Sequence, residues 1–366
     1  MRYNPVAPRI RLLLLAFLLA SCAGDMESRD TREELKRLVS EISLEGNIPG
    51  VIVFVERPDD EFLITFGSTR RGGSDTLTGQ ETLRLGSITK TYMAALALSL
   101  VEDGILDLDA PASRYLPTHT LNRLPGGLDP TVRQILGHTS GIPDYYSERF
   151  YLHDWERSEP LTPELALHAI RGLEPTITPA SSFDYSNTNY HVLALIVEEV
   201  TDRDIESLLH QYIFEPLELN ETYYDLAHPP GDVLHGYGSP FDPWEPTYEF
   251  RENSGPDGGM FATARDVATW IRALFSETGE MHEIGRMMVE SPMPDGDRKE
   301  QGLGVEILRS RTGRRVYGHT GAIDGYLSAA FFVPSSDAVI VVHATRSNEE
   351  AFTAILGGSL RLVMEG

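Results

Sequence analysis

The sequence places a hydroxyl and an amine three residues apart, in Ser87-Ile88-Thr89-Lys90. On a helix, residues i and i+3 lie on the same face, so Ser87 and Lys90 would be neighbours. A serine hydroxyl is a weak nucleophile until a base removes its proton, and a lysine held unprotonated nearby can do this. A serine at the start of a helix is the ordinary alternative. The chain contains only three lysines, however, so a chance match to this spacing is rare.

Two further polar triplets follow along the chain, Tyr185-Ser186-Asn187 and His319-Thr320-Gly321. An acyl-transfer site needs a nucleophile, a base, a proton donor for the leaving group and hydrogen-bond donors for the oxyanion, and the three motifs supply such groups. The sequence has no His-Glu-x-x-His, no pair of cysteines, no Gly-x-x-x-x-Gly-Lys and no Gly-x-Ser-x-Gly. It therefore does not support a zinc protease, a cysteine metal site, a P-loop protein or an α/β-hydrolase.

The three motifs resemble those of the serine β-lactamase and penicillin-binding superfamily, in which Ser-x-x-Lys is a signature. They look most like the branch of D-alanyl-D-alanine carboxypeptidases, class C β-lactamases and β-lactamase-like esterases. The resemblance covers nearly the whole chain after its N-terminal segment. Further segments that carry it are residues 83–86, 136–143, 183–190, 258–260 and 318–322.

Some positions depart from the family's pattern. Ala180, Ala194, Asp202 and Glu218 stand where glycine is common, which puts local turn geometry in doubt but leaves the motifs intact. His319 stands where class C β-lactamases usually carry lysine. Histidine at this position is similar to the carboxypeptidases and to some esterases, so the resemblance favours these enzymes over antibiotic hydrolysis.

The resemblance implies roles for the first two motifs. Ser87 would be the nucleophile, at a helix start where its own N–H and the helix dipole face the developing negative charge. Lys90 would be buried and unprotonated for part of the cycle, which requires a lowered pKa. Tyr185 is the other candidate for the base and would be the acid toward the leaving group, so the two groups would titrate as a coupled pair. Asn187 would hold the lysine and the substrate amide.

The third motif would line the opposite wall of the site. His319 would tune the tyrosine proton or, with Thr320, bind a substrate carboxylate. Gly321 would let the backbone approach the substrate closely. The oxyanion hole would combine the backbone N–H groups of Ser87 and Ala322.

Loops near these motifs carry a histidine and several aromatic residues. We expect His138 to be structural, because its loop borders the site but the sequence offers it no chemical partner. The aromatic residues could line a cleft or pack within their loops, and packing is the commoner case. They are Trp155, Trp244, Tyr145, Tyr146 and Tyr237.

The resemblance thus implies a serine hydrolase that acts through an acyl-enzyme on Ser87. A D-alanyl-D-alanine carboxypeptidase-like peptidase is the leading interpretation, with a small peptide or ester as substrate. A β-lactamase-like carboxylesterase is the alternative. A β-lactamase and a non-hydrolytic ligand-binding module rank below it, because a fold and a set of motifs do not determine the substrate. We expect no cofactor and no metal, and the oligomeric state stays open.

The N-terminus has the pattern of an export signal. Arginines at positions 2, 9 and 11 precede a short apolar run at residues 12–20, which is too short for a stable membrane span. The run ends in Leu-Ala-Ser-Cys, which resembles the bacterial lipoprotein box with Cys22 as the lipidated residue; a plain secretory signal is the alternative. We therefore expect a lipoprotein signal peptide at 1–21, a tether at 22–30 and an exported protein anchored to a bacterial membrane, facing the periplasm or the exterior. Cys22 is the chain's only cysteine, so no intrachain disulfide can form.

The chain is strongly acidic, with a formal net charge of -24 at pH 7. Removal of the signal would leave 28 basic against 55 acidic residues, a formal charge of -27. Such a surface repels phosphate backbones, so nucleic acid is excluded as a partner. It also provides no electrostatic attraction to an anionic membrane surface, so membrane association would depend on the lipid at Cys22.

Hydrophobic periodicity predicts an α+β fold, with an antiparallel sheet built from both termini, flanking helices and an inserted, mostly helical region. This architecture is β-lactamase/transpeptidase-like. The hydrolase domain would span 31–366, with sheet parts at about 31–85 and 300–366 and a helical part at about 86–299. Residues 223–256 predict a long irregular loop, and Thr263 to Asp266 resembles a capping box. The predicted strands are 50–56, 61–66, 305–309, 315–319, 326–333 and 338–344, and the predicted helices are 31–43, 87–102, 189–200, 205–214, 264–275 and 349–363.

Overall fold

The computed structural model describes residues 31–147, 161–224, 233–238, 242–247 and 255–365. The predicted signal peptide, the tether with Cys22, and Trp155 lie outside these residues. Within the described ranges, no helix is long and apolar enough to cross a membrane.

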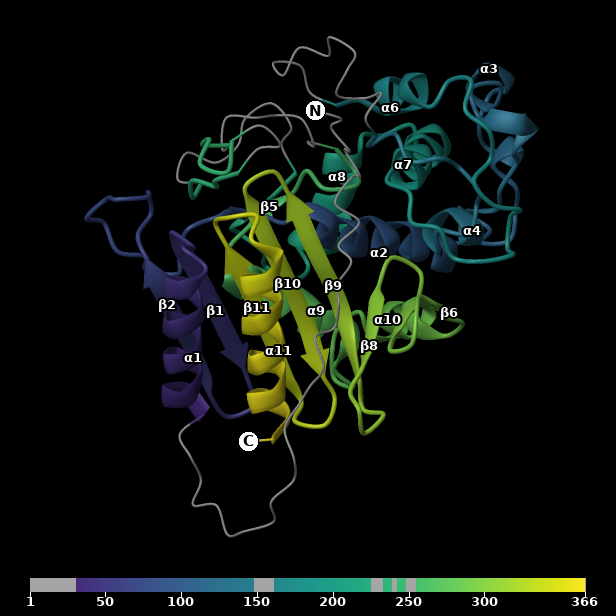
Figure 1. Cartoon of the computed structure of the whole chain (residues 1–366). Coiled ribbons are helices and arrows are strands. Elements are labelled where there is room, and N and C mark those ends of the chain that lie inside the picture. Colours follow the sequence, from purple (N-terminus) through teal and green to yellow (C-terminus); the bar gives the residue numbers. More distant parts are fainter. Residues whose placement is uncertain (1–30, 148–160, 225–232, 239–241, 248–254, 366) are drawn as a thin grey trace.

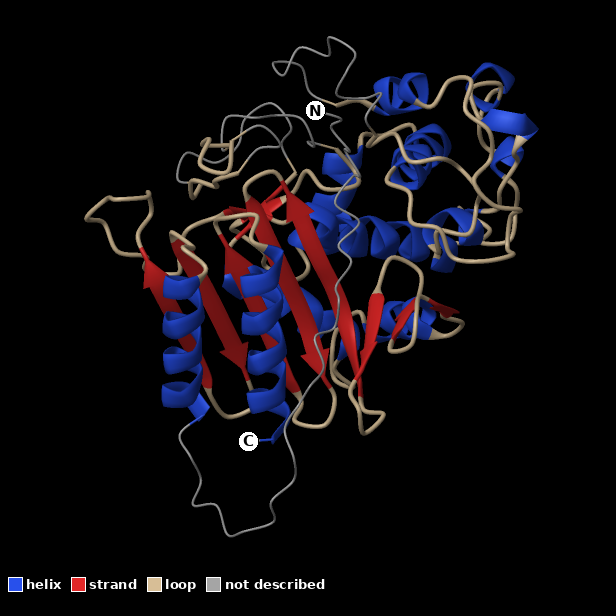
Figure 2. Cartoon of the chain, viewed as in Figure 1, coloured by secondary structure: helices blue, strands red, loops and turns tan. Residues whose placement is uncertain are grey.

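An eight-stranded antiparallel sheet forms the centre of the fold, in the order β2-β1-β11-β10-β9-β8-β7-β6 (Figures 1 and 2). Strands from the two ends of the chain pair inside this sheet, next to its β2 edge, where Val53 of β1 lies opposite Val342 of β11. A smaller sheet has the order β3-β5-β4. The α+β prediction is therefore confirmed. The strands are β1 (Gly50–Glu56), β2 (Glu61–Gly67), β3 (Leu83–Arg84), β4 (Thr222–Tyr223), β5 (Phe261–Ala262), β6 (Met293–Pro294), β7 (Lys299–Gln301), β8 (Glu306–Arg309), β9 (Arg315–Ile323), β10 (Tyr326–Val333) and β11 (Ala338–Ala344).

Helices cover both faces of the large sheet. The helices α1 (Thr31–Glu45) and α11 (Glu349–Glu365) lie side by side on one face, and α9 (Ala264–Phe275) packs against the other (Figure 1). Alternate residues of β1 enter the two cores, with Val53 on the α1/α11 side and Ile52 on the α9 side. Because both faces are covered, β1, β10 and β11 are buried along almost their whole length and are mostly apolar, without the alternation of a half-exposed strand.

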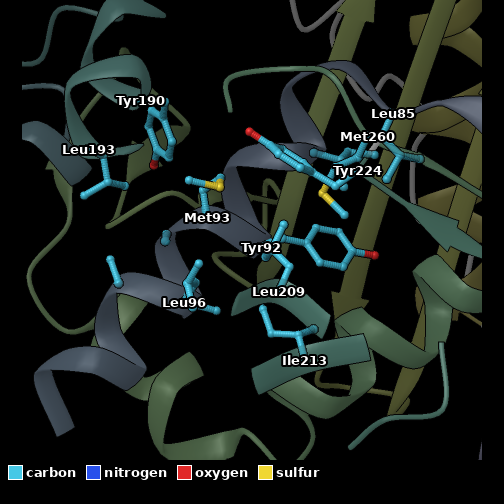
Figure 3. Close-up of a cluster of buried hydrophobic side chains, with 14 of the residues drawn as sticks. Leu85, Tyr92, Met93, Leu96, Tyr190, Leu193, Leu209, Ile213, Tyr224 and Met260 are labelled. Carbon is cyan, nitrogen blue, oxygen red and sulfur yellow. The ribbon is translucent and has the colours of Figure 1, made fainter. Parts of the chain in front are cut away.

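The inserted region is organised around the helix α2 (Thr89–Glu102), in which every residue from Thr89 to Leu100 is buried. Figure 3 shows Tyr92, Met93 and Leu96 of this helix among side chains of the surrounding helices. The remaining helical segments are η1 (Gly86–Ile88), η2 (Ala112–Arg114), α3 (Thr118–Leu121), η3 (Pro125–Gly127), α4 (Val132–Leu136), α6 (Pro163–Ala169), α7 (Thr188–Thr201), α8 (Ile205–Leu209), the π-helical turn η4 (His210–Phe214) and α10 (His282–Val289).

Several predicted boundaries were wrong. Ser87 lies in the short turn η1 and not in the α-helix, because the chain must bend from β3 into α2, and Gly86 makes this bend with φ +54°. The strand predicted at 315–319 continues to Ile323, so the third motif lies inside β9. The C-terminal part of the sheet begins at Met293, before the predicted boundary near residue 300, because β6 and β7 add two strands at its edge.

Turn geometry bears out part of the concern about missing glycines. Ala180, Asp202 and Glu218 all adopt positive φ, between 53° and 64°, which is the conformation that glycine adopts at least cost. The fourth position, Ala194, lies in the helix α7. The capping prediction is half right, because Thr263 accepts from the Asp266 N–H but the Asp266 carboxylate turns to residues 221 and 222 instead.

Candidate active site

Ser87 and Lys90 lie at the junction between the large sheet and the helical region. The turn η1 holds Ser87, and α2 holds Lys90 one turn further on. Lys90 Nζ lies 3.1 Å from Ser87 Oγ, so the two groups are in hydrogen-bonding contact. The spacing of the motif thus produces the predicted neighbours even though Ser87 precedes the α-helix.

The Lys90 amine is buried and has two other hydrogen-bond partners, Asn187 Oδ1 at 2.7 Å and the backbone oxygen of Asp257 at 2.6 Å. Both are amide oxygens, which only accept, so each must receive an N–H from Lys90. An unprotonated amine has two N–H groups and one lone pair. With both N–H groups used, the lone pair is left for the hydroxyl of Ser87.

Burial lowers the pKa of Lys90 to about 8, against the opposing effect of Asp257, Asp144 and Glu306. Taking a cation out of water favours its neutral form, and nearby carboxylates favour the charged form. A substantial fraction of Lys90 is therefore unprotonated near pH 8, as the predicted base requires.

Tyr185 approaches the same serine from the other side. Its hydroxyl donates to Ser87 Oγ at 2.7 Å. Burial raises the pKa of Tyr185 well above its usual value of 10, so the phenol is protonated at neutral pH. Of the two candidate bases, only Lys90 has a pKa within reach of neutral pH.

His138 contacts the second motif directly. Its ring stacks on Tyr185 with 4.3 Å between ring centroids, and its Nδ1 accepts the backbone N–H of Ser186 at 3.2 Å. Burial lowers the pKa of His138 well below its usual value, so the ring is neutral. The sequence offered His138 no partner, but the turn at residues 138–141 folds against the second motif, and these contacts are compatible with the predicted structural role.

Asp144 orients the amide of Asn187. It accepts the Asn187 backbone N–H at 3.2 Å and the side-chain Nδ2 at 3.1 Å, which turns Oδ1 toward Lys90. Burial raises the pKa of Asp144 to about 7. Sequence analysis missed this residue, although it directly follows Pro143 at the end of a family segment.

The third motif lies where β9 has a free edge. In the described residues, β8 pairs only with Arg315–Gly318, so residues 319–323 pair with β10 alone. Glu306, at the start of β8, accepts the Thr320 N–H at 3.2 Å and the Thr320 hydroxyl at 3.0 Å. Lys299 donates to the same carboxylate at 2.7 Å. The structure thus commits the hydroxyl of Thr320, which was expected to bind a substrate carboxylate, to a buried protein carboxylate.

His319 is also buried, and its Nδ1 contacts the backbone oxygen of Thr320. Burial lowers its pKa to about 4, so the ring is neutral at physiological pH. Among the described residues, no hydrogen bond joins His319 to Tyr185. Its predicted effect on the tyrosine proton would therefore be indirect.

Two backbone segments approach closely beside Ser87. A Cβ added to Gly321 would overlap the backbone oxygen of Leu85 and the Ser328 hydroxyl, and one added to Gly86 would lie 2.8 Å from the nitrogen of Ala322. In a strand, every second N–H points to the same edge. Since the Thr320 N–H points to the free edge, the N–H of Ala322 does so too, beside the turn that carries Ser87.

The aromatic residues in the described loops pack within the protein. Tyr145 is buried and donates to the Asp257 carboxylate, and the Tyr237 hydroxyl accepts the Arg71 N–H at 2.8 Å. Trp244 lies between the guanidinium groups of Arg71 and Arg346, which are 3.7 Å and 4.1 Å from its ring. Within the described ranges, no group of three or more His, Cys, Asp or Glu side chains is arranged to hold a metal ion.

The close approach at Gly321 leads to a direct test. Gly321→Ala should lower the free energy of unfolding by about 3 kcal/mol, because β9 must move away from Leu85. The matched control is Gly357→Ala in α11, where no atom lies within 4 Å of the added Cβ and the change should be neutral or stabilising by about 0.5–1 kcal/mol. Urea unfolding measures both variants. Equal stability of the two variants would contradict the close packing of Gly321 against Leu85.

Comparison with known proteins agrees with this geometry. The family model described as Beta-lactamase matches residues 35–363. The chain is 24% identical over 316 residues to penicillin-binding protein 4* of Bacillus subtilis, covering 81% of this chain and 68% of that protein. It is 23% identical over 333 residues to protein flp of Staphylococcus aureus, covering 88% of this chain and 64% of that protein.

Solved structures show the same fold. A D-stereospecific amidohydrolase from Streptomyces sp. superimposes with a TM-score of 0.76 at 25% identity, covering 87% of this chain and 96% of that chain. The chain spans only about two thirds of the length of the two curated relatives, but the family model extends over nearly all of its described residues. The chain belongs to the β-lactamase family of serine hydrolases and penicillin-binding proteins.

Proposed function

We propose that this chain is a serine hydrolase that forms an acyl-enzyme on Ser87, with Lys90 as the base. The observation that carries the proposal is the hydrogen bonding of Lys90 Nζ, whose two shortest contacts are to acceptors and whose third partner is the Ser87 hydroxyl. Membership of a family of hydrolases supports it.

In the acylation step, Ser87 Oγ attacks the substrate carbonyl carbon while its proton passes to Lys90 Nζ. The Oγ–C bond forms, and the bond to the leaving nitrogen or oxygen breaks. Tyr185, which is protonated and also touches Ser87 Oγ, donates its proton to the leaving atom. Lys90 then passes the serine proton on to Tyr185, so one proton moves in sum from the serine to the leaving group and both Lys90 and Tyr185 regain their starting states. Water then hydrolyses the acyl-enzyme, which releases the acid and restores the serine.

Donors for the oxyanion would come from the N–H groups of Ser87 and Ala322. The packing of Gly86 against Ala322 supports this role, because it brings the two backbone segments together. A pair of fixed N–H groups stabilises the negative charge that develops on the substrate oxygen.

Within this class, the leading substrate is a small D-alanyl peptide, as for a D-alanyl-D-alanine carboxypeptidase. Similarity to a penicillin-binding protein and to a D-stereospecific amidohydrolase supports this choice. One observation favours a second candidate, an esterase or an amidase for uncharged substrates. Thr320 donates to Glu306, so its hydroxyl is not available to the terminal carboxylate of a peptide.

A substrate panel tests the proposal and separates the candidates. We expect the purified protein to hydrolyse acyl-D-Ala-D-Ala, and Ser87→Ala to lower kcat/KM by about a thousandfold or more. The C-terminal amide of the same peptide, a short acyl ester and a chromogenic cephalosporin complete the panel. Preference for the ester or the capped peptide over the free acid would favour the second candidate. Full activity of Ser87→Ala on every substrate would refute the nucleophile assignment.

The rate should depend on pH through Lys90. Since the base must be unprotonated, kcat/KM should fall as the pH drops below about 8, by roughly tenfold per unit well below the pKa. His319, with a pKa of about 4, should add no inflection between pH 5 and 9. Initial-rate assays of one substrate at each pH across this range measure the profile of kcat/KM. A rate that is flat from pH 5 to 9 would mean that Lys90 is not the titrating base.

We also propose that the mature protein is anchored through a lipid on Cys22, on the basis of the Leu-Ala-Ser-Cys sequence after the apolar run. In a bacterial host, the full-length protein should sediment with membranes. Cys22→Ala should move it to the soluble fraction, or leave it in the cytoplasm with its signal uncleaved. Immunoblots of fractions with intact-mass measurement distinguish these states, and membrane partition unchanged by the substitution would contradict the anchor.

A further inference from the structure

A buried cluster of three titratable side chains lies directly behind Lys90 and takes no part in the proton transfers above. It consists of Asp257, His191 and Tyr145, whose exposed fractions are 4%, 0% and 1%. The Tyr145 hydroxyl donates to Asp257 Oδ2 at 3.0 Å, and His191 Nε2 lies 3.0 Å from Oδ1. A buried carboxylate lowers the stability of the fold unless it is paired, and even a paired one gives little net stability. We therefore ask what role Asp257 has at this position.

The cluster connects directly to the proposed base. The backbone oxygen of Asp257 accepts from Lys90 Nζ at 2.6 Å, so a single residue supplies both a hydrogen bond and a negative charge beside the amine. His191 lies on α7, whose first turn follows Asn187, the other acceptor for Lys90. The carboxylate therefore joins the two segments that hold the amine.

We propose that Asp257 is a positioning residue for the reaction, and that its carboxylate, held by His191 and Tyr145, offsets the positive charge that Lys90 acquires when it takes the proton of Ser87. This inference rests on the proposed function. Without a counter-charge, a buried amine binds protons weakly and is a poor base. With Asp257 in place, the amine is basic enough to accept the serine proton and still partly neutral near pH 8.

The electrostatics agree with this role. Burial dominates the pKa of Lys90, and Asp257 is the charge that opposes burial most strongly. Burial alone would raise the pKa of Asp257, but His191, Lys90 and Tyr145 together hold it below its usual value, so the group stays ionised. Asp144 is a weaker counter-charge for Lys90, because its pKa of about 7 means that it is partly protonated near neutral pH.

Other titratable groups also surround Lys90, and the test must separate Asp257 from them. The carboxylates act in the same direction as Asp257, the two histidines are neutral, and the tyrosines are protonated. These groups are Asp144, Glu306, His138, His319, Tyr185 and Tyr190.

The test compares the pH dependence of Ser87 acylation in the wild type and in Asp257→Asn. Intact mass measures labelling by a fluorophosphonate at each pH, which needs no knowledge of the substrate. Asparagine keeps the backbone carbonyl and the shape but removes the charge. We expect the acid limb to move down by about one pH unit and the plateau rate to fall by about threefold or more.

Two controls separate charge from structure. Asp266→Asn removes a different carboxylate, which is only partly buried and accepts from the Glu221 N–H and the Thr222 hydroxyl. This variant should leave the acid limb in place even if it lowers the melting temperature. Tyr145→Phe removes a hydrogen bond to Asp257 but keeps its charge, so the limb should move by less than about half as much. If Asp257→Asn does not fold, Asp257→Ala removes the same charge without leaving an amide to be satisfied.

The outcomes distinguish this inference from the proposed function. An acid limb in the wild type that shifts in Asp257→Asn and not in Asp266→Asn supports the inference. If the acid limbs of Asp257→Asn and Asp266→Asn both stay within about 0.3 pH unit of the wild-type limb, the inference is overturned and Lys90 remains the base. A wild type with no acid limb, or labelling that persists in Ser87→Ala, overturns the proposed function and this inference with it.

Discussion

The burial of the Lys90 amine is the constraint on which the rest of the site depends. An ammonium group taken out of water loses several kcal/mol of hydration unless the protein replaces it. Here the replacement comes from parts of the chain that are far apart, since Asn187 and Asp257 stand 97 and 167 residues from Lys90. The fold must therefore bring a turn, a helix start and a loop to one nitrogen atom.

The architecture meets this requirement by enclosing α2. Because this helix is apolar nearly all round, other elements cover it on every side, and Lys90 lies in its buried first turn. The free edge of β9 completes the site, where Gly86 and Gly321 allow two backbones to approach more closely than side chains would permit. Each reactive group thus stands on a packed element whose position is set by the core.

Three buried carboxyl groups near the site differ in pKa because their surroundings differ. Burial leaves Asp144 with a pKa of about 7, whereas the donors around Asp257 and Glu306 outweigh burial and hold their pKa values below the usual ones. Asp144 orients an amide, Glu306 holds the third motif, and Asp257 lies behind the base. The neutral His319 stands where class C β-lactamases usually carry a lysine, and the nearby Lys299 cation is paired with Glu306. Family membership places the chain among proteins that are mostly hydrolases, while this local chemistry bears on which substrate the site would accept.

The sequence by itself determined the local features: the i, i+3 neighbours Ser87 and Lys90, most of the long strands and helices, and the two later motifs. These were predictable because helix periodicity and apolar runs are properties of adjacent residues. Only the tertiary structure decided that Asp144, Asp257 and Glu306 surround the motifs, that Thr320 is committed to Glu306, and that Lys90 and not Tyr185 has a pKa near neutrality. The physical reason is that burial and long-range partners set hydrogen bonding and pKa, and a linear pattern does not contain these partners until the chain has folded.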